Sequence, residues 1–170
     1  MNIRNRIKEL RQVNANELLP NPKNWREHPT RQTDALRGVL SQIGFADAVL
    51  VRETPEGLML LDGHARTEIV GDCEIPVLVL DQNDEEADLL LATLDPLAAM
   101  ADSNADALAE LLPTLEAQSE AVKELLDGLA KQNGIFDELP ADADGKEFNE
   151  TIGDEVEMIT CPHCGEQFPK

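Results

Sequence analysis

The segment Leu60–Glu68 reads Leu-Leu-Asp-Gly-His-Ala-Arg-Thr-Glu and places a glycine between an apolar run and a candidate helix. The apolar residues before Asp62 are typical of a buried strand, and His64–Val70 can form a short helix. Gly63 permits a positive φ angle and a close approach of the backbone. The sequence therefore predicts a strand, a tight turn and a helix in direct succession.

This turn is also a candidate anion site. The first N–H groups of a helix have no partner within the helix, and they favour a negative ligand. Arg66 would lie about one turn into the helix, where its planar guanidinium suits a phosphate. His64 and Thr67 can add donors, and Asp62 can cap the helix or orient Arg66. We therefore expect Gly63, His64, Arg66 and Thr67 to bind a phosphate group. The alternative is an ordinary turn with Arg66 paired to an acid.

The residues before the turn indicate a helix and a hairpin. Apolar residues fall at helical spacing over Leu36–Ile43, with Thr33 able to cap the helix and Gly44 placed to end it. Two short apolar runs follow, Ala48–Glu53 and Leu58–Leu61, and the sequence Thr-Pro-Glu-Gly separates them. This pattern predicts a β-hairpin that leads directly into the turn.

Both flanks of this central region also contain expected elements. Residues 1–11 are basic and can form a short helix, and Gln12–Ala15 is expected to be a first short strand. Ile75–Leu80 indicates another buried strand, in which Pro76 predicts either an edge position or a place among the first residues. Cys73 is expected to lie in the core.

The second half of the chain is predicted to be helical and acidic. Asn83, with Glu86 three residues later, resembles a capping box that opens an apolar helix. Within residues 103–134, Pro113 should kink or end a first helix, and Gly134 should end a second one. Two apolar stripes lie in this region: Leu108, Leu111, Leu112 and Leu115, then Val122, Leu125, Leu126 and Leu129. Each stripe needs a covering surface, which the rest of the chain or another subunit can supply.

Charge is distributed unevenly. The chain has a net charge of −20, yet residues 1–40 carry eight Lys or Arg against four acids, and residues 81–170 carry four against 23. The first part can meet a polyanion locally, while the acidic part repels one over about 8–10 Å. We therefore do not expect the chain alone to bind free DNA tightly. Arg26, Arg31 and Arg37 can form a nucleic-acid rim, or they can be ordinary solvated residues.

The cysteines indicate an intracellular protein with a candidate metal motif. Cys161 and Cys164 have the spacing of a zinc knuckle, which supplies two of the four ligands that a structural site needs. Two chains of a homodimer, or a second protein, would complete such a site; the alternative is a thiol pair without metal. The odd number of cysteines, the absence of a signal-like apolar run and the lack of 18 consecutive apolar residues predict a cytoplasmic protein without a membrane span.

The order of these elements resembles the N-terminal domain of ParB proteins in the ParB/sulfiredoxin superfamily. Asp62–Glu68, after a hairpin, is similar to the G-x-x-R box of that family, and Glu17–Pro22 is similar to its Asn-Pro segment after the first strand. Gly44–Val51 is similar to the segment that enters the next strand. The resemblance covers roughly residues 12–100. Lys8–Ala101 in particular looks like the ParB-like modules of phage and mobile-element proteins.

The resemblance implies an α+β fold, a small mixed sheet with flanking helices, over residues 1–101. Composition then predicts an acidic α-helical region at 102–134, an acidic flexible linker at 135–155 and a tail with the Cys pair at 156–170.

The resemblance also implies phosphate chemistry. In partition proteins the G-x-x-R box binds the triphosphate of a nucleotide, usually CTP. In sulfiredoxin a nucleophilic Cys follows the Gly, but His64 stands here, so that reaction has no nucleophile. The Asn-x-x-Arg segment of the family is expected near residues 81–95, where Asp81–Asp88 is acidic instead, and no helix-turn-helix is recognisable in residues 103–134. These departures argue against a sliding clamp.

The preferred function is therefore a regulatory or accessory module that binds a nucleotide or DNA phosphate through its basic N-terminal half. One alternative is a nuclease or nucleotidase that uses Asp62, His64 and Glu68 with Mg²⁺. Another is an assembly or adaptor protein whose acidic helices contact a protein partner or a second copy of the chain.

Overall fold

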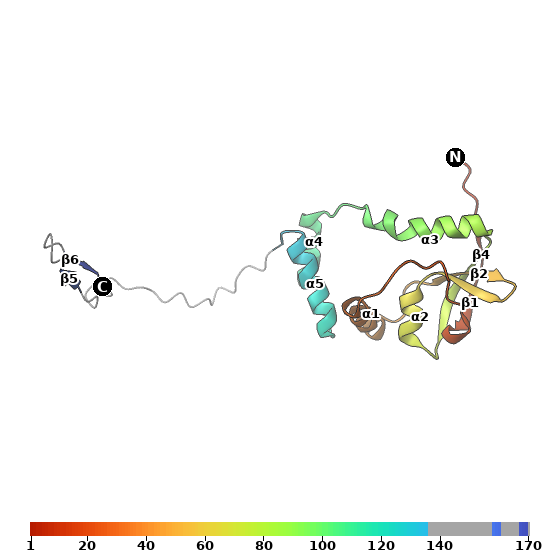
Figure 1. The fold of residues 1–170 in the computed structure, drawn as a ribbon, viewed down its shortest axis with the longest axis horizontal. Helices are drawn as coiled ribbons and strands as arrows, with labels where there is room; N and C mark the ends of the chain where they lie inside the picture. Colours follow the sequence, from red (N-terminus) through yellow and green to blue (C-terminus); the bar gives the residue numbers. More distant parts are fainter. Residues whose placement is uncertain (136–157, 161–166, 170) are drawn as a thin grey trace. The chain divides into compact units, whose positions relative to one another are not determined.

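The computed structural model describes residues 1–135, 158–160 and 167–169 of the 170-residue chain. The chain divides into two units, Met1–Ile135 and Phe136–Lys170 (Figure 1). In the second unit, β5 (Met158–Thr160) and β6 (Gln167–Pro169) pair in antiparallel fashion. Within the described residues, no helix combines the length and the apolar character needed to cross a membrane.

The first unit contains the other elements. In chain order they are β1 (Ile7–Asn14), η1 (Ala15–Glu17), α1 (Thr30–Ile43), β2 (Val49–Thr54), β3 (Gly57–Asp62), α2 (His64–Val70), β4 (Glu74–Leu80), α3 (Asp84–Ala99), α4 (Ala105–Leu111), η2 (Leu112–Thr114) and α5 (Glu120–Gln132).

The strands β1 to β4 form a mixed sheet in the order β1-β4-β2-β3. The hairpin β2–β3 and the pair β1–β4 are antiparallel, whereas β2 and β4 are parallel. A parallel pair needs a crossover connection, and the chain makes it through β3 and α2. The expected α+β fold with a small mixed sheet is confirmed.

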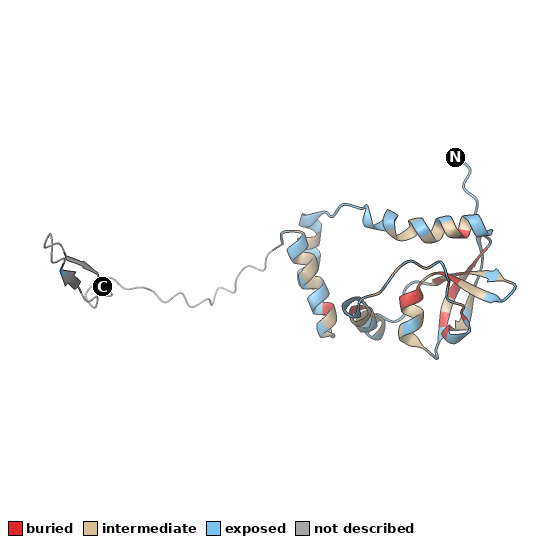
Figure 2. Ribbon diagram, in the orientation of Figure 1, coloured by how far each residue is buried: buried red, intermediate tan, exposed pale blue. Residues whose placement is uncertain are grey.

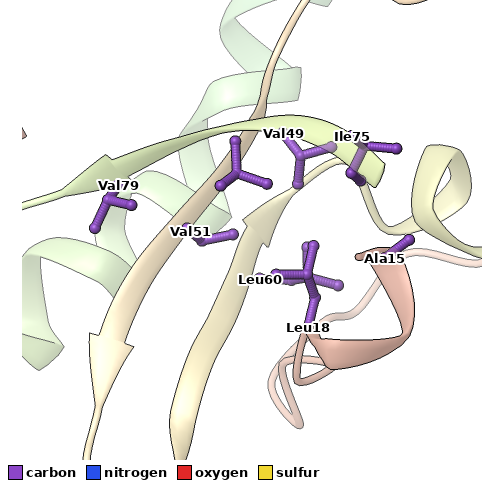
Figure 3. Close-up of a cluster of buried hydrophobic side chains, with 8 residues drawn as sticks. Ala15, Leu18, Val49, Val51, Leu60, Ile75 and Val79 are labelled. Carbon is purple, nitrogen blue, oxygen red and sulfur yellow. The ribbon is translucent and has the colours of Figure 1, made fainter. Parts of the chain in front are cut away.

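Alternating residues of the strands build two cores, one on each face of the sheet. The larger core gathers Val49, Val51, Ile75, Val77 and Val79, all fully buried, together with Ala15, Leu18 and Leu60 (Figures 2 and 3). The smaller core joins Leu61 and Leu80 of the sheet to Ala87 of α3. Complete burial of one such aliphatic side chain contributes about 1.5–3 kcal/mol. The sheet therefore carries a core on each face, and α3 packs on the second face.

Helix α5 packs against α1. A Cβ atom at Gly38 would lie 2.7 Å from Val122 Cγ2, so the two helices can approach this closely only because α1 has a glycine there. The Gln42 side chain also fixes the segment before α5, since its amide donates to Glu116 O at 2.7 Å and its carbonyl accepts from Gln118 N at 3.1 Å. Part of the second apolar stripe is thus covered by this unit itself.

Three expectations for local structure are wrong. The N-terminal helix does not form, because Ile7–Asn14 is extended and pairs with β4. Helix α1 begins at Thr30, and its N-cap is Pro29, four residues before Thr33, the expected cap. Cys73 is exposed, in the turn between α2 and β4. For Pro76 the second alternative is confirmed: it is the third residue of β4, which lies between β1 and β2 and not at an edge.

Other local expectations are confirmed. The hairpin, helix α2 and the Asn83–Glu86 capping box are all present. Pro113 lies in the 3₁₀ turn that follows α4, and Gly134 has a φ angle of 69° just beyond α5. The expected linker falls almost wholly on residues 136–157, which lie outside the described residues.

Candidate anion-binding cleft

Gly63 makes the turn between β3 and α2 possible. Its φ and ψ angles are 93° and 18°, in the left-handed region that disfavours other residues. A Cβ atom at this position would also lie 2.8 Å from Val49 Cγ2, in the buried core. Thr67 fastens the turn, since its backbone N–H and its hydroxyl each donate to Gly63 O at 3.0 Å. The hydroxyl proton of Thr67 is therefore used within the turn.

A cleft of about 230 Å³ lies beside this turn. Its walls come from the turn, the loop before α1, the first half of α1 and the middle of α3. The lining residues are Asn24, Arg26, His28, Gln32, Leu36, Leu61, Asp62, Gly63, His64, Ala65, Arg66, Leu91, Leu94 and Asp95. The structure thus brings Gly63, His64 and Arg66 together at one cavity, and Thr67 holds the carbonyl of Gly63.

Arg66 lies in the wall of the cleft and pairs with two acids. One terminal nitrogen is 2.7 Å from Asp47 Oδ2, and the other is 2.6 Å from Asp62 Oδ2. The Arg66 side chain is only 16% exposed, whereas that of Asp47 is 76% exposed. The hydrogen bond from Arg66 is the main reason why the pKa of Asp47 lies below its usual value. The guanidinium is therefore held in a fixed direction, with its charge compensated by carboxylates.

His64 is buried at the first position of α2. Its Nε2 atom accepts a hydrogen bond from Asn21 N at 3.4 Å, which places the proton of the neutral ring on Nδ1. Burial is the main cause of a lowered pKa for His64, opposed by the nearby Asp62 and Glu68 carboxylates. The neutral ring therefore ties the Asn-Pro segment to the turn.

The three arginines proposed as a rim lie in different surroundings. Arg26 lines the cleft, where it forms an ion pair with Asp95, and its guanidinium carbon lies 5.2 Å from the centre of the Trp25 ring. Arg31 donates to the backbone of α5, and Arg37 pairs with an acid one turn earlier on α1. Only Arg26 shares a cavity with the Gly63–Arg66 turn.

The metal-dependent alternatives gain no support from the described part of the chain. Among those residues, no group of three or more His, Cys, Asp or Glu side chains is placed to hold a metal ion. Asp62 already binds Arg66, so Asp62, His64 and Glu68 do not offer the clustered carboxylates that Mg²⁺ requires. Cys161 and Cys164, the candidate zinc ligands, lie outside the described residues.

Several residues that line the cleft or pair with its arginines were not predicted from the sequence. Asp47 and Asp95 are acids that neutralise Arg66 and Arg26, and His28 adds a second imidazole to the lining. Their partners lie far away along the chain, so no local motif identifies them.

Comparison with solved structures places this architecture among known folds. The chromosome-partitioning protein ParB from Caulobacter crescentus, complexed with CTP-γ-S, is 17% identical, with a TM-score of 0.52; the match covers 74% of this chain and 71% of that one. The chain has a ParB-like fold. No protein-family model and no curated protein matches it.

Weaker similarities to solved structures are also present. They include the pNOB8-like ParB N-domain (15% identity, TM-score 0.45, 99% of this chain and 56% of that chain) and sulfiredoxin from Arabidopsis thaliana (15%, 0.41, 49% and 97%). These add nothing to the fold assignment. The expected ParB-like architecture is confirmed as a fold, whereas the phage or mobile-element type stays a prediction.

Proposed function

We propose that residues 1–135 form a ParB-like regulatory or accessory module that binds the phosphate of a nucleotide or nucleic acid in the cleft beside the Gly63–Arg66 turn. The observation that carries this proposal is the convergence of a glycine turn, Arg66 and Arg26 on one cavity. CTP is the first ligand to test, because the ParB structure with the same fold was complexed with CTP-γ-S.

The residues take distinct roles in this proposal. Gly63 lets the backbone approach the ligand, and Arg66 binds the phosphate through its planar guanidinium. His64 keeps the turn and the Asn-Pro segment together, and its Nδ1 proton is a further donor. Thr67 fixes the carbonyl of Gly63.

The ion pairs of Arg66 permit an exchange of partners. A guanidinium has five N–H donors, so Arg66 can stay bonded to Asp62 while it binds a phosphate. Asp47 is the partner that gives way, because its carboxylate is mostly exposed and recovers its hydration when it leaves. Asp62 thus keeps Arg66 oriented, while the phosphate replaces Asp47.

A nucleotide fits this cleft better than a long DNA duplex. Asp88 and Asp95 of α3 lie along the loop that forms the cleft wall, and the acidic second half of the chain repels an extended polyanion. A duplex would meet these charges over its length, whereas a nucleotide presents its phosphates only within the cleft.

Isothermal titration with CTP, ATP and a short DNA duplex tests the proposal. Arg66→Gln should weaken binding by about tenfold or more, because a hydrogen bond to a charged group is worth about 1.5–3 kcal/mol. Arg11→Gln is the matched control, since Arg11 is an ion-paired arginine on β1, away from the cleft. Absence of heat with all three ligands, or equal binding by Arg66→Gln, would refute the site.

An adaptor role is a second candidate, favoured by apolar side chains on the surface of the helices. Leu97, Met100, Leu111 and Leu125 are 46–76% exposed. Such residues suit a protein partner or a second copy of this chain. Light scattering of the full chain tests self-association: a mass above one chain, reduced by Met100→Asp, supports a homodimer, and a single-chain mass in the unmodified protein opposes it.

Cytoplasmic location and a zinc knuckle stay predictions.

A further inference from the structure

The loop before α1 is fastened along helix α3. Lys23 Nζ lies 2.5 Å from Asp88 Oδ2, and Arg26 forms an ion pair with Asp95. Asp88 and Asp95 are seven residues apart, so they lie on the same face of α3. The segment Lys23–Arg26 therefore runs parallel to this helix and is held at both of its ends.

A third contact lies between these two ion pairs. Trp25 Nε1 donates to Leu91 O at 3.4 Å, and Leu91 follows Asp88 by one helical turn. The Trp25 ring also lies near the guanidinium of Arg26, with 5.2 Å between its centre and the guanidinium carbon. Such a cation–π contact helps to fix the direction of the arginine. Arg26 is therefore held between an aromatic ring and a carboxylate.

The two ion pairs differ in their relation to the cleft. Arg26 and Asp95 both line it, whereas Lys23 and Asp88 do not. The side chains of Arg26 and Asp95 are each about one third exposed, so both can meet an incoming ligand. Asp95 thus places a negative charge in the cleft wall, where it would repel the phosphate of a ligand. Every arginine lining the cleft is already paired with a carboxylate.

We propose that Asp95 is a built-in competitor for the phosphate of the ligand. Asp95 is paired with the guanidinium of Arg26 when the cleft is empty. This ion pair breaks when a phosphate enters and binds Arg26. This inference rests on the proposed function, because it concerns the same cleft. It makes Asp95 a specificity-determining residue: a ligand binds only if its own contacts outweigh both the loss of the Arg26–Asp95 pair and the repulsion from the freed carboxylate.

Titration of the full chain with CTP at constant ionic strength tests this inference in three proteins. Asp95→Asn keeps the shape of the side chain and removes its charge. It should tighten CTP binding by about tenfold, because the repulsion between this carboxylate and the phosphates is removed. Asp88→Asn is the matched control, because it removes the same charge from the same face of α3, outside the cleft. Its affinity should stay within about twofold of the unmodified chain. Circular dichroism confirms that each variant is folded.

Each outcome decides the question. Tighter binding by Asp95→Asn alone supports the inference, including the case in which only this variant binds measurably. Equal or weaker binding by Asp95→Asn overturns the inference while leaving the proposed function intact, because the unmodified chain still binds. Equal tightening by Asp88→Asn also overturns it, since the effect would then be one of overall charge. Absence of binding in all three proteins refutes CTP binding itself and the inference with it.

Discussion

Arg66 and Asp62 form an ion pair of 2.6 Å that bridges the Gly63 turn, and both residues line the cleft. A second pair, 2.7 Å long, joins Arg66 to Asp47 in the segment before β2. The arginine is therefore oriented before any ligand arrives, and its charge is compensated. Preorganisation of this kind lowers the entropic cost of binding. Exchange of one carboxylate for a phosphate then becomes the central step.

The Gly63 turn should be highly sensitive to substitution. Gly63→Ala places a Cβ atom 2.8 Å from Val49 Cγ2 and forces alanine to a φ angle of 93°. We expect a loss of about 2–4 kcal/mol in the free energy of unfolding, measured by urea denaturation. Gly134→Ala is the control, because Gly134 also has a positive φ angle, 69°, with no atom within 4 Å of its added Cβ. It should cost only about 1 kcal/mol. Equal losses would show that contact with the core does not matter.

His64 should make the stability of the protein depend on pH near neutrality. Burial lowers its pKa below the usual 6.5, so the folded chain binds this proton less readily than the unfolded chain. Stability is therefore complete above about pH 6.5 and falls as the pH drops below that value. Urea denaturation across this range should show a smaller decline for His64→Gln than for the unmodified chain. Parallel curves would contradict this account.

Glu86 should contribute to stability in a more acidic range. Two hydrogen bonds from Arg6 are the main reason why the pKa of Glu86 is lowered to about 2. The hydrogen bond from Asn83 N has the next largest effect. The stabilisation is therefore complete above pH 4.5 and lost as the pH falls towards 2. Glu86→Gln should flatten the decline of the unfolding free energy in this window. The exposed neighbour Glu85, changed to Gln, should leave the slope unchanged. Identical slopes for all three proteins would exclude this role.

Local signals explain which elements were predictable. The β2–β3 hairpin and the Asn83–Glu86 capping box depend on residues a few positions apart, and both are present. The start of the chain shows the opposite case. Ile3, Ile7 and Leu10 have helical spacing, but Leu10 pairs with Leu78 in the sheet. Pairing with a strand so distant in the sequence overrode the local pattern, which is common for short apolar segments.

The cleft was predictable only in part, for the same reason. The strand–glycine–helix arrangement around Gly63 is a local pattern, and the structure contains it. The partner of Arg66 in the segment before β2 is 19 residues away, and Asp95, the partner of Arg26, lies on another element altogether. The compensation of both arginines by acids follows from the packing of α3 and of the loops. No motif in the sequence encodes it.

Two-dimensional ¹H–¹⁵N NMR of the full chain during titration with CTP shows whether phosphate binds at the Gly63–Arg66 turn. We expect progressive shifts of the Gly63, His64 and Ala65 amides and of the Arg66 side-chain Nε–H signal. In Arg66→Gln the same amide shifts should require about tenfold more CTP, or more. Shifts confined to residues outside the cleft, or unchanged signals from the Gly63–Arg66 turn while CTP binds, would contradict this expectation.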